Sequence, residues 1–211
     1  MHYNKSSIFI LGAGSHGIVI ADNLIRNNKK VYFLDDNKEL LKKNIYGKIS
    51  VIGSIKNIDI FEKRIDSIIL GLGDKYLTER RQLFKKLKVK YKFTNSIHNT
   101  CIISKSAKIG NGIFIGASVY IGANVIINDN TVIYPGTVIE HGTKIEENVY
   151  ISPSVSIAGN VLVRKNTFLG IGVNIIPDLT IEENSFIAAG SLVIGNTLKN
   201  KRYMGVPAKI K

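Results

Sequence analysis

Aliphatic residues recur at every sixth position through the second half of the chain. From Ile103 to Val193 each of these positions is Ile, Val or Leu. The fourth residue after each is Ala, Ser, Thr or Val, apart from the larger Ile113 and Leu179. A period of six matches neither the 3.6-residue repeat of a helix nor the two-residue repeat of a simple strand. It is typical of a parallel β-helix, in which each hexad forms a short strand and a corner and three hexads close a triangular coil. The pattern predicts an all-β solenoid of about five coils, with both rows facing inward.

The residues between the two inward-facing rows predict the corners of the coils. Most corners contain Gly or Asn, which tolerate the positive φ angles of tight turns. These corner residues are Asn111–Gly112, Asn124, Asn130, Gly136, Gly142, Asn148, Gly159–Asn160, Asn166, Gly172, Asn184 and Gly190. Other apolar residues are predicted to face outward and to favour packing against another chain. They are Ile126, Val132, Val138 and Leu162.

The chain upstream of the repeat predicts a separate α/β unit. A strand at 7–11 is followed by the sequence Gly-Ala-Gly-Ser-His-Gly, a helix over 18–28 and a second strand at 31–34. A third strand fits 67–71 and is followed by a helix that runs through Lys86. We therefore assign 1–95 to a Rossmann-like half-domain, 96–196 to the solenoid and 197–211 to a cap on its open end.

The glycine-rich turn indicates a site for a phosphate group. Gly12, Gly14 and Gly17 have the G-x-G-x-x-G spacing between a strand and a helix, where backbone N–H groups approach a phosphate. Because so short a unit cannot form the six-stranded dinucleotide fold, a mononucleotide or nucleotide sugar is favoured over NAD. A tight turn without a ligand is the alternative. The predicted substrate-binding residues are Gly12, Gly14, Ser15, His16, Gly17, Asp35, Asp36, Gly73 and Asp74.

Charge and cysteine content narrow the class of protein. The net charge is +13, and a basic run extends from Arg80 to Lys92. We interpret this run as a solvated helix face, with attraction of an anionic small molecule as the alternative. No nucleic-acid-binding module accompanies the charge, so nucleic-acid binding is not predicted. The single cysteine, Cys101, excludes an internal disulfide and suits the reducing cytoplasm.

Membrane insertion and metal binding are not predicted either. The chain has no apolar stretch of membrane-spanning length and no signal-peptide layout at its N-terminus. Its histidines are far apart in the sequence, and no Cys/His group has zinc-ligand spacing.

His141 is the candidate catalytic residue. It occupies the third position of its hexad, which is a corner, so its ring is expected to point outward. The residues predicted to stack below and above it are Ala123 and Gly159, both small. An imidazole in open space can act as the general base for an attacking amine or hydroxyl. We find no acyl-enzyme nucleophile, so direct attack on a bound acyl donor is expected, with a backbone N–H near Ala158–Gly159 as the oxyanion donor.

The order of motifs resembles a known family. The motifs are Gly12–Gly17, Val138–His141, Ala158–Val161, Phe168–Gly170 and Gly205–Lys209. Over nearly the full length, the chain is similar to the bacterial sugar acetyltransferases of the bacillosamine N-acetyltransferase and sialic-acid O-acetyltransferase type. The resemblance implies a left-handed β-helix, a homotrimer, and acetyl-CoA bound between neighbouring solenoids. It also implies a nucleotide-linked sugar on the N-terminal domain and His141 as the base. Glu140 or a neighbouring chain is the candidate substitute for the acid that orients the histidine in that family. The cofactor-binding residues that it implies are Tyr150, Ala158, Gly159, Gly170, Ile171, Ala188, Gly205, Pro207 and Lys209.

Two residues depart from the pattern of that family. The residue after the histidine is usually acidic there, and here it is Gly142; a further histidine nine positions on is replaced by Tyr150. If His141 lacks an orienting partner, we expect Gly142→Glu, which restores the acid, to be neutral or activating.

The expected activity is transfer of an acetyl group from acetyl-CoA to a nucleotide-linked amino sugar, without a metal, in the synthesis of a surface glycan such as lipopolysaccharide or capsule. The alternatives are O-acetylation of a sialic-acid-like sugar and a non-catalytic nucleotide-sugar-binding scaffold. A dehydrogenase is the remaining interpretation of the glycine-rich loop.

Overall fold

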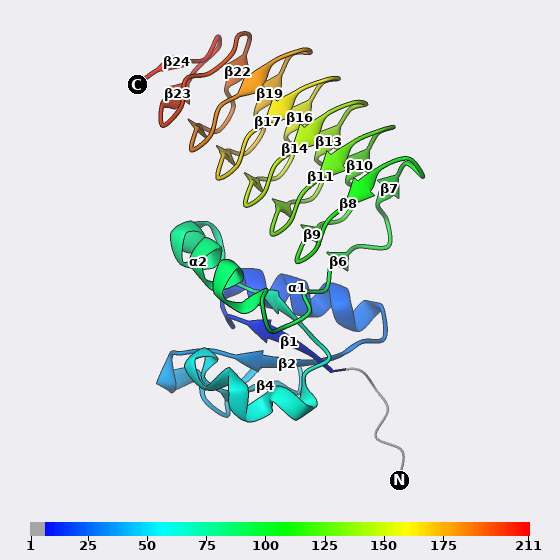
Figure 1. Cartoon of the computed structure of the whole chain (residues 1–211), viewed down its shortest axis with the longest axis vertical. Helices are drawn as coiled ribbons and strands as arrows, with labels where there is room; N and C mark the ends of the chain where they lie inside the picture. Colours follow the sequence, from blue (N-terminus) through cyan, green and yellow to red (C-terminus); the bar gives the residue numbers. More distant parts are fainter. Residues whose placement is uncertain (1–6) are drawn as a thin grey trace. The chain divides into compact units, whose positions relative to one another are not determined.

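The computed structural model describes residues 7–211 (Figure 1). Two compact units meet in sequence between Ser96 and Ile97, the first α/β and the second all-β. The α/β unit followed by a solenoid of short parallel strands confirms the predicted fold class. No helix among the described residues is both long enough and apolar enough to cross a bilayer.

The N-terminal unit is built on one five-stranded sheet in the order β3-β4-β2-β1-β5. Strands β1, β2, β4 and β5 are parallel, and β3 runs antiparallel to β4. The elements are β1 (Ser7–Leu11), α1 (Ser15–Arg26), β2 (Lys30–Leu34), η1 (Lys38–Leu40), β3 (Asn44–Tyr46), β4 (Ile49–Gly53), η2 (Ile55–Arg64), β5 (Ser67–Leu70), η3 (Asp74–Tyr76) and α2 (Leu77–Leu87). The sequence analysis did not anticipate β3 and β4, which extend the sheet beyond β2.

The core of this unit follows from apolar runs that are buried throughout. All five residues of β1, which lies between β2 and β5, are buried, as are all four of β5, as expected for parallel strands covered on both faces. The segment around Phe93 adds only an isolated bridge with Ile68.

The solenoid consists of three sheets of short strands (Figure 1). The strands contain two residues each, except β23 with three, and all are parallel except β24. The six-stranded sheet contains β7 (Ile102–Ile103), β10 (Tyr120–Ile121), β13 (Val138–Ile139), β16 (Ser156–Ile157), β19 (Asn174–Ile175) and β22 (Leu192–Val193). The five-stranded sheet contains β8 (Lys108–Ile109), β11 (Ile126–Ile127), β14 (Lys144–Ile145), β17 (Leu162–Val163) and β20 (Thr180–Ile181). The eight-stranded sheet contains β6 (Ser96–Ile97), β9 (Phe114–Ile115), β12 (Val132–Ile133), β15 (Tyr150–Ile151), β18 (Phe168–Leu169), β21 (Phe186–Ile187), β23 (Arg202–Met204) and β24 (Lys209–Ile210).

Both predicted inward rows are buried. From Ile115 to Val193 the aliphatic row is at most 3% exposed. The second row is also buried from Ile113 to Ser191, apart from Leu179, which is only partly covered. Threonines in the second row keep their hydroxyls satisfied: Thr143 Oγ1 donates to the carbonyl of Ala158 at 3.0 Å. The interior therefore combines stacked aliphatic side chains with hydrogen bonds between successive coils.

The corners show a conformational period as strict as the hydrophobic one. From residue 112 to residue 190, every sixth residue has a positive φ. Gly or Asn occupies most of these positions, as predicted, but Ser118, Ser154 and Asp178 adopt the same conformation. Steric strain in this region is lowest for Gly and modest for Asn and Asp.

The last fifteen residues continue the eight-stranded sheet. Strand β23 pairs in parallel with β21, and β24 then folds back antiparallel to β23. The segment predicted to cap the solenoid thus adds one further strand before it reverses.

One outward-facing residue is not exposed as expected. Val132 is 1% exposed, whereas Ile126, Val138 and Leu162 are partly exposed. Val132 pairs with Phe114 and Tyr150 on neighbouring strands, and aromatic side chains line this face of the sheet. Val132 is therefore already covered within one chain and does not support packing against another.

The strict corner conformation predicts that replacing two glycines of the last coil by alanine has different effects on stability. Neither Gly190 nor Gly195 would bring a Cβ within 4 Å of another group, but only Gly190 has a positive φ, of 69°. We expect Gly190→Ala to lower the free energy of unfolding by about 1 kcal/mol, because the left-handed conformation strains an L side chain. Gly195→Ala should leave it unchanged or slightly raised. Denaturant unfolding of both variants checks this, and equal effects would contradict it.

Candidate active site

The glycine-rich turn is shaped by close backbone packing. A Cβ on Gly17 would lie 2.1 Å from Gly12 O, and one on Gly71 would lie 2.3 Å from the same oxygen. Gly12 itself has a φ of 110°. These glycines are therefore required where β1, α1 and β5 approach one another. Gly14 has no group within 4 Å of its Cβ position, so it leaves open space at the start of α1.

The acidic residues after β2 hold loops in place. Asp35 Oδ2 accepts the N–H of Ala13 at 2.7 Å, and its Oδ1 accepts the N–H of Asn37 at 2.8 Å. Asp36 accepts the Ser54 hydroxyl and, at 3.1 Å, the N–H of Lys56. In this structure both carboxylates fix backbone conformation beside the predicted substrate site.

The remaining predicted substrate residues follow the carboxyl ends of β1 and β5, which are neighbours in the sheet. Ser15 begins α1 and is exposed, and Gly73 precedes η3, which begins at the exposed Asp74. Ligands of parallel α/β sheets bind beyond such strand ends, where neighbouring connections diverge. The structure therefore brings the predicted residues of this unit to one edge of the sheet.

His16 differs from its neighbours because its side chain is buried. It is 4% exposed, and burial and then the charge of Arg80 hold its pKa well below the usual value of 6.5. A Cβ on Gly73 would lie 3.6 Å from His16 Cβ, so the histidine packs beneath the loop after β5. His16 is positioned to support this edge of the sheet rather than to face solvent.

In the solenoid, His141 lies at the corner between β13 and β14, with its side chain 66% exposed. A Cβ on Gly159 would lie 2.7 Å from both Cε1 and Nε2 of His141. The ring thus occupies the space that Gly159 leaves on the next coil. Glu140 Oε2 lies 3.8 Å from His141 Nδ1.

The backbone and the neighbour of Gly142 argue against an activating effect of Gly142→Glu. Gly142 has a φ of 68°, and a Cβ there would lie 2.3 Å from Asn160 Oδ1. Asn160 is held in turn, because its N–H donates to His141 O at 2.9 Å and its Nδ2 donates to Asp178 Oδ1 at 3.1 Å. An acid at position 142 therefore strains the corner.

The choice of oxyanion donor is reduced to one of the two residues predicted. The N–H of Ala158 donates to Ile175 O at 3.1 Å as part of the ladder between coils. Of the pair Ala158–Gly159, only Gly159 is left as a candidate donor.

The remaining predicted cofactor residues do not lie at this corner. Tyr150 is on β15 of the eight-stranded sheet, is 6% exposed, and stacks on Phe168 with ring centroids 5.5 Å apart. Gly170, Ile171 and Ala188 follow strands of that sheet. Gly205, Pro207 and Lys209 belong to the C-terminal segment of β23 and β24. Within one chain, only Ala158 and Gly159 of the predicted set are beside His141.

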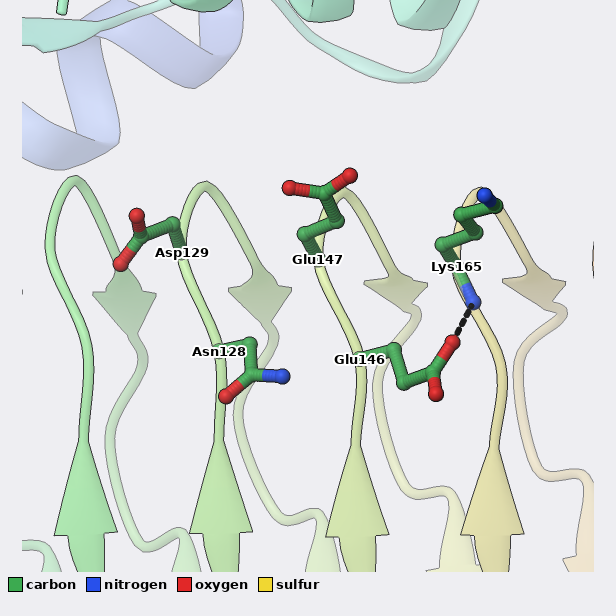
Figure 2. A pocket seen from close by; sticks show the side chains of 5 residues that line it. All are labelled: Asn128, Asp129, Glu146, Glu147 and Lys165. Carbon is green, nitrogen blue, oxygen red and sulfur yellow. Dashed lines mark hydrogen bonds between the residues drawn. The ribbon is translucent and has the colours of Figure 1, made fainter.

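A pocket of about 340 Å³ occurs at a different corner, between the five- and eight-stranded sheets (Figure 2). Its lining is mostly acidic and consists of Asn128, Asp129, Glu146, Glu147 and Lys165. Glu146 Oε2 accepts the N–H of Lys165 at 3.1 Å, and Asp129 Oδ1 accepts that of Asn111 at 2.9 Å. These contacts link successive coils. Residues 7–211 contain no group of His, Cys, Asp and Glu arranged to hold a metal ion. This pocket contains none of the predicted site residues.

Comparison with known proteins finds a matching family model for each of the two units. The sequence profile of the PglD N-terminal domain matches residues 7–87, and that of the bacterial transferase hexapeptide (six repeats) matches residues 106–141 and 124–159. The chain therefore contains a PglD-type N-terminal domain followed by transferase hexapeptide repeats, and it is an acyltransferase. No curated protein sequence matches it significantly.

Solved structures share this two-unit architecture. Perosamine N-acetyltransferase from Caulobacter crescentus, solved with CoA and GDP-perosamine, is 26% identical with a TM-score of 0.91, over 98% of this chain and 97% of that one. That structure is of the H141N variant, and another is of the H141A variant, in that protein's own numbering. The acetyltransferase domain of PglB from Neisseria gonorrhoeae, solved with acetyl coenzyme A, is 22% identical with a TM-score of 0.90, over 99% and 100% of the two chains. This second likeness shows a shared fold.

The burial of Arg80 and the place of the Asn160 side chain beside Gly142 were not predicted from the sequence. Arg80 was placed on a solvated helix face, yet it is 3% exposed. The buried residues of α2 are Arg80, Phe84 and Leu87, and this helical spacing was the signal that marked the inner face. Asn160 was noted only as a corner residue, although its side chain fills the space beside Gly142.

We predict that Gly159→Ala displaces the His141 ring and lowers acetyl transfer. A misplacement of about 1 Å at a catalytic group can reduce the rate by about 100-fold. Ala123→Ser, on the coil below, adds an atom at an exposed position and should keep a rate close to wild type. Steady-state turnover of both variants checks this, and wild-type turnover by Gly159→Ala would contradict the stacked geometry.

Gly142→Glu should destabilise the protein and should not activate it. The left-handed conformation alone costs a non-glycine residue about 1–2 kcal/mol, and the Glu side chain must also displace Asn160. Denaturant unfolding and turnover of this variant measure both effects. An unchanged unfolding free energy together with a faster rate would show that the corner adapts to an acid.

Proposed function

We propose that the protein transfers the acetyl group of acetyl-CoA to the amino group of a nucleotide-linked sugar, with His141 as the general base. The observation that carries this proposal is the exposed His141 ring, seated over Gly159 beside Glu140. The relative from Caulobacter crescentus, bound to CoA and GDP-perosamine, supports an amino sugar linked to a nucleoside diphosphate as the acceptor. CoA and acetyl coenzyme A in the solved relatives support the donor.

Acetyl transfer to an amine needs one general base and one path by which the amine proton reaches the CoA sulfur. The sugar amine attacks the thioester carbonyl, a C–N bond forms, and the amine proton moves to the His141 ring. The tetrahedral intermediate then collapses, the C–S bond breaks, and the imidazolium returns the proton to the CoA sulfur. Glu140 stabilises the charged ring, and the N–H of Gly159 is the proposed oxyanion donor.

We further propose that the active site is completed by a second copy of the chain in a homotrimer. Tyr150, Gly170, Ile171 and Ala188 belong to corners or faces other than that of His141. Two solenoids side by side would present the His141 corner of one chain to the Tyr150 face of another. The partly exposed Ile126, Val138 and Leu162 supply apolar surface for such packing. The setting that we propose for this activity is cytoplasmic synthesis of a surface glycan such as lipopolysaccharide or capsule.

The N-terminal unit is proposed to hold the nucleotide. The open space at Gly14, the N-terminus of α1 and the neighbouring loop at Gly73–Asp74 form the edge where a diphosphate would bind.

The direct test is thiol release from acetyl-CoA in the presence of UDP-, GDP- and dTDP-linked amino sugars. The proposal expects turnover with at least one of these acceptors. Turnover only on a free sialic acid would instead establish O-acetylation. Nucleotide-sugar binding without acetyl-CoA binding or turnover would establish a scaffold.

His141→Ala should lower turnover by about 10²–10⁴-fold, the usual contribution of a general base. His141→Asn, which keeps hydrogen bonding but cannot take a proton, should be nearly as slow. Binding of acetyl-CoA to both variants, measured by calorimetry, should match wild type, because the ring acts on the acceptor. Wild-type turnover by His141→Ala would end this mechanism and leave the fold intact.

A further inference from the structure

Arg80 is a buried cation at the edge of the sheet where the nucleotide is proposed to bind. It lies on α2, is 3% exposed, and shares the inner face of that helix with Phe84 and Leu87. Its Nη1 donates to Leu70 O at 2.8 Å and to Leu72 O at 3.3 Å. One nitrogen of the guanidinium therefore holds the end of β5 and the first residues of the loop that follows it.

The loop held by Arg80 is packed against the glycine-rich turn. Gly71, between the two carbonyls, donates its N–H to Leu11 O at 2.8 Å. A Cβ on Gly71 would lie 2.3 Å from Gly12 O and 2.9 Å from Gly17 Cα. A shift of the loop after β5 would therefore move the glycine-rich turn as well.

His16 connects the same two loops from the side of α1. It is the second residue of α1, is buried, and packs under Gly73. The charge of Arg80 is the second cause, after burial, of its lowered pKa. The guanidinium is thus close enough for its positive charge to be felt at the N-terminus of α1.

We propose that Arg80 is a positioning residue that makes this edge of the sheet select a diphosphate, by fixing the loop after β5 and by adding positive potential beside the N-terminus of α1. The inference rests on the proposed function, because it concerns how the nucleotide sugar is held. The positive end of a helix and a poorly screened cation act together on an anionic ligand. Arg80 touches carbonyl oxygens and is assigned no contact with the ligand or with the reacting atoms.

Three variants of the full-length protein separate the two contributions of Arg80. Arg80→Met removes the charge and the hydrogen bonds, and Arg80→Lys keeps the charge but loses the planar fork. Arg81→Met removes the same charge from the next residue of α2, which is partly exposed and is not assigned to the site. The probes are UDP and GDP, with uridine and guanosine as uncharged counterparts, measured by calorimetry.

Loss of hydrogen bonds to a charged group predicts about 10- to 100-fold weaker UDP or GDP binding by Arg80→Met. Arg80→Lys should bind more tightly than Arg80→Met and less tightly than wild type. Arg81→Met should bind like wild type, because exposed charges contribute little. Uridine and guanosine should lose little affinity in any variant. The KM for the nucleotide sugar should rise in Arg80→Met with little change in kcat, and CoA binding should be unchanged, which also reports that the solenoid is folded.

The pKa of the His16 imidazole is a second readout. It reports the positive potential that Arg80 adds, separately from the hydrogen bonds by which Arg80 holds the loop. In Arg80→Met the pKa of His16, followed by NMR, should rise but stay below 6.5, because burial remains. It should not move in Arg81→Met. Unchanged nucleotide affinity in Arg80→Met, or an equal loss in Arg81→Met, would overturn the inference while leaving the proposed function standing. If the wild type binds neither UDP nor GDP, the nucleotide site and this inference both fail.

Discussion

The left-handed backbone conformation at every sixth residue is the constraint on which the rest of the solenoid depends. From residue 112 to residue 190 each of these residues turns the chain by the same amount, so strands of two residues stack with partners eighteen positions away. The inward rows remain in register only while this turn is kept. The same stacking places Gly159 over His141, so the geometry of the candidate catalytic corner is a direct consequence of the corner conformation.

This dependence on the corner conformation is the reason that we expect Gly142→Glu, which restores the acid of the family, to destabilise the protein. Position 142 is the residue with positive φ in its hexad, and the coil above fills the adjacent space with Asn160. Glu140, on the other side of the histidine, lies outside that constraint and can approach the ring. The acid beside His141 is thus found where the backbone tolerates a side chain. The N-terminal unit uses glycine differently, because Gly17 and Gly71 are required by contact with Gly12 O rather than by their own φ.

The sequence predicted features that repeat and missed features that depend on single contacts. The inward rows, most corners and the strand–turn–helix around Gly12 follow from local pattern, because period and glycine spacing reflect backbone geometry directly. Ser118, Ser154 and Asp178 were not expected at positive φ, since their residue types do not require it; the coil imposes it. Val132 was expected to face outward and be available, but it is buried within one chain, on the face of the sheet where aromatic side chains stack. Arg80 was hidden within a basic run, because charge alone suggested solvent whereas its helical spacing placed it inside. The candidate site was predictable at His141 and Gly159, which one coil separates. The cofactor-binding residues implied by the family resemblance, apart from Ala158 and Gly159, lie on other faces or in the C-terminal segment, and no period in one chain relates them to His141.

The most direct test of the account is a crystal structure of the protein with CoA and the nucleotide-linked amino sugar that it acetylates. The account predicts that the sugar amine lies within hydrogen-bond distance of the His141 ring and that the CoA sulfur lies beside Gly159, with a second chain completing the groove. A CoA sulfur seated at another corner, away from His141, would contradict it.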